Sequence, residues 1–208
     1  MNSRLRFTFA PVAAAFALTL CGCTIAGDYH VADGAHMQRG YRSIAGAVQI
    51  GSDAIIRNAT TVAGAIEVGD RATTRSLNSV AGEIQIGERT NIDGDVSTVA
   101  GAIRINARTH VTGEVGSIAG AIDLNGCRVD GRVSVTKGSL RTRGPTLLPG
   151  GIVVRGAHSM GNDNPPRIDI GPGADVASIH VEPGTEIDLH ISREAHVGTV
   201  SGATASYY

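Results

Sequence analysis

Aliphatic and polar residues alternate along most of the chain in a repeat of about 18 residues. Residues 43–50, Ser-Ile-Ala-Gly-Ala-Val-Gln-Ile, return four more times in closely related form. The glycines of this motif are 18, 18, 19 and 19 residues apart, and they are Gly46, Gly64, Gly82, Gly101 and Gly120. Repeats of this length are typical of solenoids, in which each repeat forms one coil and stacks on its neighbours.

A shorter period of six residues divides each repeat into three parts. Counted from Val62, an aliphatic residue or threonine falls at every sixth position as far as Leu124, with single extra residues near Thr98 and Ser117. A second apolar or small residue follows most of these after four positions. Since strand side chains alternate between two faces, we expect two inward residues on each of three strands per coil. The predicted inward set includes Val62, Val80, Val99 and Ile118.

This pattern predicts the fold class. We expect an all-β, single-stranded parallel β-helix, a triangular solenoid with 18–19 residues per coil. The motif glycines fall at a predicted corner, where glycine tolerates left-handed or crowded backbone. Between the inward positions lies a polar series of mixed charge, predicted to face solvent: Gln49, Glu67, Gln85, Arg104 and Asp123.

Residues 1–22 have the features of an export signal. Arg4 and Arg6 precede an uncharged, mostly apolar segment over residues 7–20, shorter than the roughly 20 residues of a membrane-spanning helix. The sequence Leu20-Cys-Gly-Cys23 then resembles the lipobox of bacterial lipoproteins. That resemblance implies cleavage before Cys23, lipidation of its thiol and, with Thr24 in place of Asp, sorting to the outer membrane. An ordinary secretory signal with incidental cysteines is the alternative.

The sequence predicts three parts. A signal peptide over residues 1–22 precedes a lipidated, polar tether over 23–40 and a β-helix domain over 41–205. Residues 142–166 contain four of the seven prolines and are predicted to form an irregular insertion around a single strand at 152–155. The six-residue pattern returns at residue 168 and predicts two closing coils.

Composition narrows the function classes. Aromatic residues make up 3% of the chain, with no tryptophan, so small β-branched residues must fill the core. The formal net charge of −1 gives no basic surface of the kind that nucleic-acid-binding proteins carry. We therefore expect no nucleic-acid partner.

Two runs carry a family resemblance. Residues 86–96, Ile-Gly-Glu-Arg-Thr-Asn-Ile-Asp-Gly-Asp-Val, and residues 105–115, Ile-Asn-Ala-Arg-Thr-His-Val-Thr-Gly-Glu-Val, resemble the bactofilins, polymer-forming β-helical cytoskeletal proteins of bacteria. The resemblance implies a right-handed triangular β-helix that assembles end to end without nucleotide. Bactofilins usually lie in the cytoplasm, whereas this chain has an export signal. The repeated Val-Ala-Gly-Ala-Ile is also similar to head repeats of β-helical adhesins among secreted lipoproteins.

Two enzymatic hypotheses have some support in the sequence. Val68-Gly-Asp-Arg-Ala72 is similar to the repeats of hexapeptide acyltransferases, whose base is a histidine, but His110 is predicted to point outward. Three histidines can bind zinc, and His180 and His196, close to one coil apart, are the candidates for a metal site together with His190. Solvated surface histidines are the alternative interpretation. Cys127 is a lone thiol that either pairs between molecules or fills a small buried space.

These observations predict a non-enzymatic protein without catalytic residues or cofactor. We expect an envelope-anchored structural, assembly or adhesion lipoprotein of the outer membrane, held by a lipid on Cys23 and acting through the ends or faces of the β-helix. Its predicted partners are the membrane and further copies stacked end to end. The alternative function is binding of a polysaccharide or another cell-envelope partner along one face, although all four tyrosines lie near the ends of the mature chain: Tyr29, Tyr41, Tyr207 and Tyr208.

Overall fold

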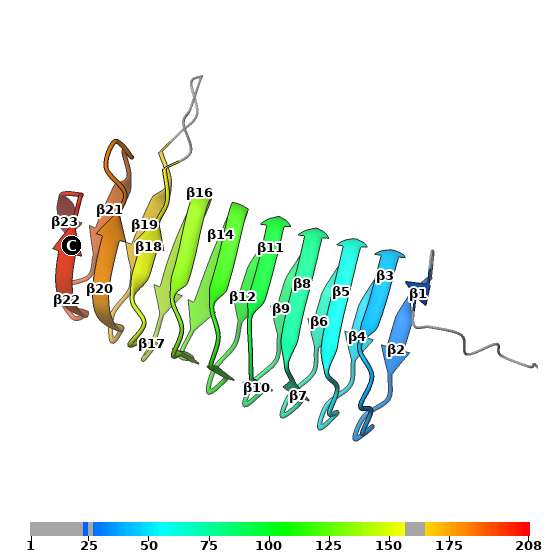
Figure 1. Cartoon of the computed structure of the whole chain (residues 1–208). Coiled ribbons are helices and arrows are strands. Elements are labelled where there is room, and N and C mark those ends of the chain that lie inside the picture. The colour runs from blue at the N-terminus through cyan, green and yellow to red at the C-terminus, as the bar shows by residue number, and fades with distance from the viewer. Residues whose placement is uncertain (1–22, 25–26, 157–164) are drawn as a thin grey trace, which may run out of the picture.

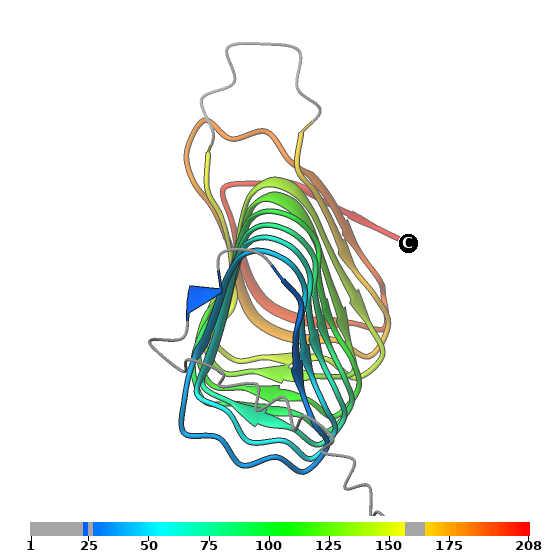
Figure 2. The same cartoon turned by 90° about the vertical axis from the view of Figure 1, so that its right-hand side faces the viewer.

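A computed structural model describes residues 23–24, 27–156 and 165–208. It confirms the predicted fold class: the described chain is a parallel β-solenoid of about nine coils with no helix (Figure 1). Seen from the amino-terminal end, the chain turns clockwise as it recedes, so the solenoid is right-handed (Figure 2). The export signal, residues 1–22, lies outside the described residues.

Three parallel sheets, which we call faces A, B and C, wrap the core. Face A contains β1 (Cys23–Thr24), β3 (Tyr41–Ala45), β5 (Asn58–Ala63), β8 (Ser76–Ala81), β11 (Val96–Ala100), the first parts of β14 (Val115–Asn125) and β16 (Val133–Arg143), β18 (Ile152–Val154), β20 (Asp175–Val181) and β22 (His196–Ser201). Face B contains β2 (Tyr29–Val31), β4 (Val48–Ile50), β6 (Ile66–Val68), β9 (Ile84–Ile86), β12 (Ile103–Ile105), the last parts of β14 and β16, β19 (Arg167–Ile170), β21 (Asp188–Ile191) and β23 (Ala205–Tyr207).

Face C is built from the shortest strands. They are β7 (Thr73–Thr74), β10 (Asn91–Ile92), β13 (His110–Val111), β15 (Arg128–Val129) and β17 (Leu147–Leu148), followed by the start of β20. The bridge from His36 to Ile55, and on to Thr73, extends this face toward the amino terminus. Pairing of Ser43 with Thr61, and of Thr98 with Ser117, confirms both predicted coil lengths.

The core is a narrow column of stacked aliphatic side chains. Ile66, Ile84, Ile103 and Ile122 lie one above another on face B, each no more than 1% exposed. Burial of this kind stabilises by roughly 25 cal/mol per Å² of apolar surface removed from water. The predicted inward positions on faces B and C are correct, and Arg104 and its neighbours in the polar series point outward.

The predicted phase of face A is wrong at four positions. Val62, Val80, Val99 and Ile118 point outward, and the residue before each points into the core. The corner between faces A and B takes two outward residues in succession before the motif glycine. A strict six-residue count misses this extra residue. The inward positions are occupied by hydroxyl residues instead: Ser43, Thr61, Ser79, Thr98 and Ser117.

The motif glycines are required by crowding between coils. A Cβ atom added to Gly82 would lie 2.0 Å from the carbonyl oxygen of Gly64, and one added to Gly101 would lie 2.1 Å from that of Gly82. Left-handed backbone of the kind expected at a corner also occurs between faces B and C. There Arg71, Arg89 and Arg108 have φ values of 57°, 56° and 60°.

The expected tether forms the first coil. Tyr29 to Val31 pair with β4, and Val31 is 1% exposed. The ring of Tyr29 packs against that of Tyr41 with centroids 4.5 Å apart. Cys23 and Thr24 pair with Arg42 and Ser43. Besides Val31, the inward positions of this coil carry the aromatic Tyr29 and the small Ala35, so its sequence hides the aliphatic pattern.

The expected insertion over residues 142–166 is shorter in the structure. Thr142 and Leu148 are buried at regular inward positions, and β17 and β18 continue the coil as far as Val154. The departure begins after Arg155, and Ser139 pairs with Arg167, so this coil is longer than every earlier one. Prolines at 145 and 149 therefore occupy corners of a regular coil.

Adjacent residues at the A–B corner give a test of the corrected phase. Thr98→Asp places a carboxylate at a position that is 3% exposed, whereas Val99 is 43% exposed. We expect Thr98→Asp to lower the free energy of unfolding by about 3 kcal/mol or more because the charge is desolvated without a partner. Val99→Asp should cost about 1 kcal/mol or less. Urea unfolding of the two variants measures the difference. If Val99→Asp lowered the free energy of unfolding more than Thr98→Asp, the six-residue count would be correct at this corner.

The buried hydroxyls give a second test. The Thr98 hydroxyl has no hydrogen-bond partner, and valine stands at the equivalent position in later coils, as in Val135 and Val154. We expect Thr98→Val to raise the free energy of unfolding by about 1 kcal/mol. Thr109 is the matched control, since its Oγ1 donates to the Gly87 carbonyl at 2.7 Å. Thr109→Val should therefore lower stability by about 1 kcal/mol, and an equal effect of both changes would contradict this account.

Candidate interaction surfaces

The histidines predicted as metal ligands are not brought together. His196 pairs with Asp175 and His180 pairs with Ser201, so the two histidines lie five residues apart along adjacent strands. That separation is about 16 Å at the rise of a strand. The Nδ1 of His180 lies 2.8 Å from the Ser201 hydroxyl. Among the described residues, no group of three or more His, Cys, Asp or Glu side chains is arranged to hold a metal ion.

His110 belongs to an ion cluster on face C. Its Nε2 lies 2.7 Å from Asp130, which also accepts a hydrogen bond from Arg128 at 2.7 Å. The hydrogen bond with His110 lowers the pKa of Asp130, and Arg128 lowers it further. This arrangement ties neighbouring coils together at the surface. It does not place His110 beside a hydroxyl or a thiol that it would activate.

Cys127 fills a small space in the core. It is 2% exposed, and burial raises the pKa of its thiol to about 12. A buried thiol with so high a pKa is a poor nucleophile. The packing role considered from the sequence fits this environment, and pairing between molecules does not.

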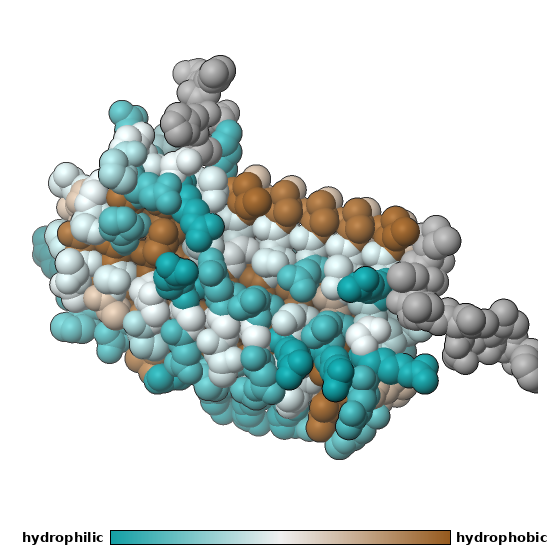
Figure 3. Space-filling view, in the orientation of Figure 1, coloured by the Kyte–Doolittle hydropathy of each residue, from teal (hydrophilic) through white to brown (hydrophobic). Residues whose placement is uncertain are grey.

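An exposed apolar ridge runs along the corner between faces A and B. Ile44, Val62, Val80, Val99 and Ile118 are between 43% and 52% exposed. Each is followed by an exposed alanine: Ala45, Ala63, Ala81, Ala100 and Ala119. We call these ten residues the apolar ridge. Figure 3 shows the row of hydrophobic side chains along the upper edge of the amino-terminal half. Contiguous exposed apolar surface of this kind marks interaction sites.

The carboxyl-terminal end of the solenoid exposes a section of its core. Val197 and Val200 on β22 continue the inward columns of Val176 and Ile179. The two earlier residues are fully buried, whereas Val197 and Val200 are only half-buried. Among the described residues, β22 and β23 pair only with β20 and β21. Their other edge therefore has unpaired backbone groups.

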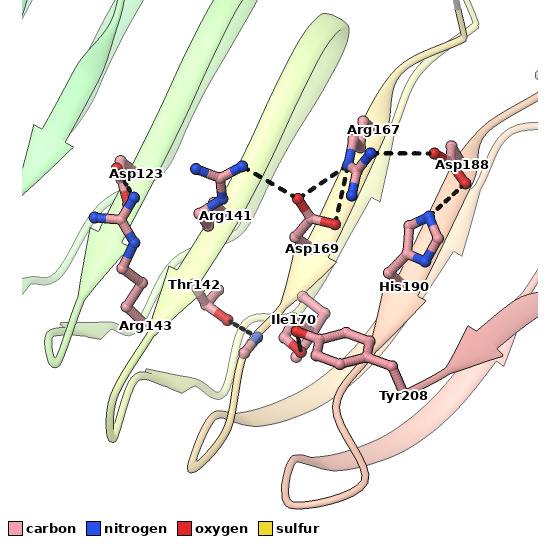
Figure 4. A network of polar contacts seen from close by, with 11 residues as sticks. Asp123, Arg141, Thr142, Arg143, Arg167, Asp169, Ile170, Asp188, His190 and Tyr208 are labelled. Carbon is pink, nitrogen blue, oxygen red and sulfur yellow. Dashed lines mark hydrogen bonds and ion pairs between the residues drawn. The ribbon is translucent and has the colours of Figure 1, made fainter.

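A charged network covers the carboxyl-terminal half of face B (Figure 4). Asp169 contacts Arg167 at 3.1 Å and Arg141 at 3.5 Å, and His190 Nε2 lies 2.7 Å from Asp188. Asp188 also faces Arg167 at 3.9 Å. Next to this network, the Tyr208 hydroxyl donates to the Ile170 carbonyl at 3.4 Å, across a groove of about 400 Å³.

The charges of this network balance. Arg141, Arg143 and Arg167 contribute three positive charges, and Asp123, Asp169 and Asp188 contribute three negative ones. The groove itself is lined by three of these arginines and one of these aspartates, Asp169. Because each arginine is already paired with a carboxylate of the same face, part of its charge is neutralised before an anionic ligand arrives.

Cys23, the predicted lipidation site, lies in β1 at the edge of the first coil. In the parallel pairing of β1 with β3, Cys23 lies opposite Arg42. Among the described residues, no helix is long and apolar enough to cross a membrane.

No family model, curated protein or solved structure matches the chain. The interaction surfaces are thus interpreted from their geometry. Reasoning from the sequence missed the apolar ridge. The available signal was the order of residues in every motif: a hydroxyl residue, an aliphatic residue, an alanine and a glycine. Because strand side chains alternate between two faces, an inward hydroxyl residue requires the aliphatic residue after it to point outward.

Proposed function

We propose that this chain is a non-enzymatic assembly protein of the bacterial envelope, anchored to the outer membrane by a lipid on Cys23. In this proposal, copies stack end to end through the terminal coils. The observation that carries the proposal is the half-buried state of Val197 and Val200, which occupy inward core positions but have no coil beyond them among the described residues.

An open edge favours pairing with another chain. Solenoids that remain monomeric close their ends with capping elements. An unpaired parallel strand next to an uncovered core invites a further strand to bind. A second copy supplies the matching surface, because β1 and β2, within the described chain, pair on one side only, with β3 and β4.

Stacking of the last coil on the first coil of another copy would continue the three faces. Such a head-to-tail contact uses two different surfaces and does not close on itself, so it produces open filaments instead of dimers. The first coil differs from the later coils, because the rings of Tyr29 and Tyr41 fill part of its cross-section. These rings would bring apolar area against Val197 and Val200.

The anchor is supported by the sequence around Cys23 and by its place in the first coil. The lipobox resemblance implies several acyl chains on this residue, and more than one chain holds a protein at a membrane stably. Because β1 lies directly on β3, the attachment point would lie at the solenoid itself and not at the end of a flexible tether.

The polysaccharide-binding alternative has weaker support. The groove beside Tyr208 offers one exposed aromatic ring, and its three arginines are already paired with carboxylates of face B. Ligand sites usually combine apolar and aromatic side chains with a few polar groups free to fix the ligand. A strict monomer in the assembly experiment would favour this alternative.

Replacement of the anchor residue tests membrane attachment. We expect Cys23→Ser to abolish acylation, to prevent processing of the signal and to remove the lipid-dependent part of membrane association. Metabolic labelling with a fatty-acid analogue and mass spectrometry of the amino-terminal peptide measure acylation. Cys127→Ser is the control, since the Cys127 thiol is buried and takes no part in attachment. Equal acyl labelling of Cys23→Ser and the unchanged protein would refute lipidation at this site.

Replacement of the exposed core residues tests assembly. Residues 23–208 carrying Cys23→Ser include every described coil and no lipid. We expect this solenoid to form filaments visible by electron microscopy, and Val197→Lys with Val200→Lys to abolish them by placing charge in the stacking surface. The matched control is His196→Lys with Thr199→Lys, which adds lysines at exposed positions of β22.

Circular dichroism confirms that each variant keeps its sheet structure. Sedimentation of the otherwise unchanged solenoid as a monomer at every concentration would contradict end-to-end assembly. Filaments that persist in the Val197 and Val200 variant would place the contact elsewhere.

A further inference from the structure

We propose that the apolar ridge lies on the surface of the lipid bilayer, so that the anchored half of the solenoid rests lengthwise on the membrane. This inference rests on the anchor at Cys23 from the proposed function. The ridge presents five half-exposed aliphatic side chains in one line, with Val80 at its centre. Five stacked coils at about 4.8 Å spacing place Ile44 and Ile118 about 19 Å apart.

The column that forms the ridge changes character along the solenoid. After Ile118, the equivalent position is held by Thr136, then by Arg155 and then by Glu182. The alanine after Ile118 is replaced by Lys137. The same corner is therefore apolar in the coils nearest Cys23 and polar in the coils farthest from it. A requirement for folding alone would not divide one corner in this way.

The flanks of the ridge suit a bilayer surface. The preceding outward positions on face A carry one charged residue, Arg42 beside Ile44, and then only uncharged ones: Thr60, Asn78, Ser97 and Gly116. On the face B side, Glu83 lies close to the ridge and is paired with Arg104. Flanks that are mostly uncharged or paired allow an apolar line to approach the lipid headgroups, and the cation of Arg42 lies where anionic headgroups would attract it.

The predicted lipid attachment point is continuous with the ridge. Cys23 and Thr24 pair with Arg42 and Ser43, the two residues before Ile44. The sequence Thr24-Ile-Ala-Gly27 also repeats the motif that builds each step of the ridge. By register, Cys23 lies beside Arg42, which is two residues before Ile44, about 7 Å along a strand. Acyl chains on Cys23 would thus enter the bilayer beside the line of exposed aliphatic residues.

The size of the ridge favours a membrane over a second copy of the chain. The ten residues of this line together expose about a few hundred Å² of accessible surface. A stable complex of two proteins buries about 800 Å² on each partner. The ridge is too small to hold a partner from solution. It is large enough to orient a protein that acyl chains already keep at the surface, since the second contact is then intramolecular.

Fluorescence at single labelled cysteines tests this orientation. The full chain, processed and acylated, is reconstituted in vesicles of phosphatidylethanolamine and phosphatidylglycerol and labelled with a polarity-sensitive fluorophore at Val99→Cys or Val80→Cys. The control is Thr112→Cys, an exposed position on the opposite side of the coil that contains Val99. We expect lipids with a nitroxide near the headgroup to lower emission roughly twofold or more at the ridge positions and not at 112.

Mass spectrometry of the acylated peptide separates the two proposals. Acylated, vesicle-bound protein without quenching at positions 80 and 99, or with equal quenching at 112, would overturn the ridge contact and leave the anchor intact. A blue-shifted but unquenched probe would show that protein covers the ridge and would also overturn the proposal. An unmodified Cys23 would refute the anchor, and with it the bilayer as the occupant of the ridge.

Discussion

Each coil of this protein is held to the next by backbone hydrogen bonds that require neighbouring chains to lie in register about 4.8 Å apart. The tightest point of this stacking is the column of motif glycines, where the carbonyl oxygen of Gly64 occupies the space that a Cβ atom of Gly82 would need. The corner between faces A and B therefore repeats the same residue order in successive coils. The fixed cross-section, the narrow core and the straight line of exposed aliphatic residues follow from that constraint.

The repeat is sufficient to predict the fold, because one unit cannot bury its own apolar face and must stack on its neighbours. It is insufficient to predict which residues point inward at the A–B corner. Val99 is apolar and points out, whereas Thr98 carries a hydroxyl and points in. A prediction from hydrophobicity places the apolar residue inside and the hydroxyl residue outside, so it is wrong at this corner. Such local disagreement between residue type and environment is expected where a surface has a function.

Two other differences have similar causes. The sequence of the first coil predicts a tether because Tyr29 stands where later coils have an aliphatic residue, and aromatic packing replaces the repeated pattern there. The prolines around Leu148 predict an insertion, yet proline is tolerated at corners, where no ladder hydrogen bond is lost. Of the candidate sites, Cys23 is predicted from its motif alone, and its lipidation stays a prediction. The separation of His180 and His196 requires the register of β20 and β22.

The proposed anchor, the apolar ridge and the open end have a fixed spatial relation to the axis of the solenoid. The proposed anchor and the apolar ridge lie along one line of the solenoid, and the open end lies across it. Filaments built by stacking would carry their anchors and ridges along the axis of assembly, so a membrane would hold copies in the orientation in which their ends meet. Restriction to a surface raises the effective concentration of those ends.

Hydrogen–deuterium exchange in the last coil tests the open end most directly. In a monomer, the backbone amides of β22 and β23 that lack a partner should exchange rapidly, while those of β9 inside the stack stay protected. We expect the amides of β22 and β23 to become protected as the protein concentration rises and copies stack. Protection of these amides in the monomer would show that the end is already closed. Rapid exchange at every concentration, in protein that nevertheless associates, would show that copies meet through another surface.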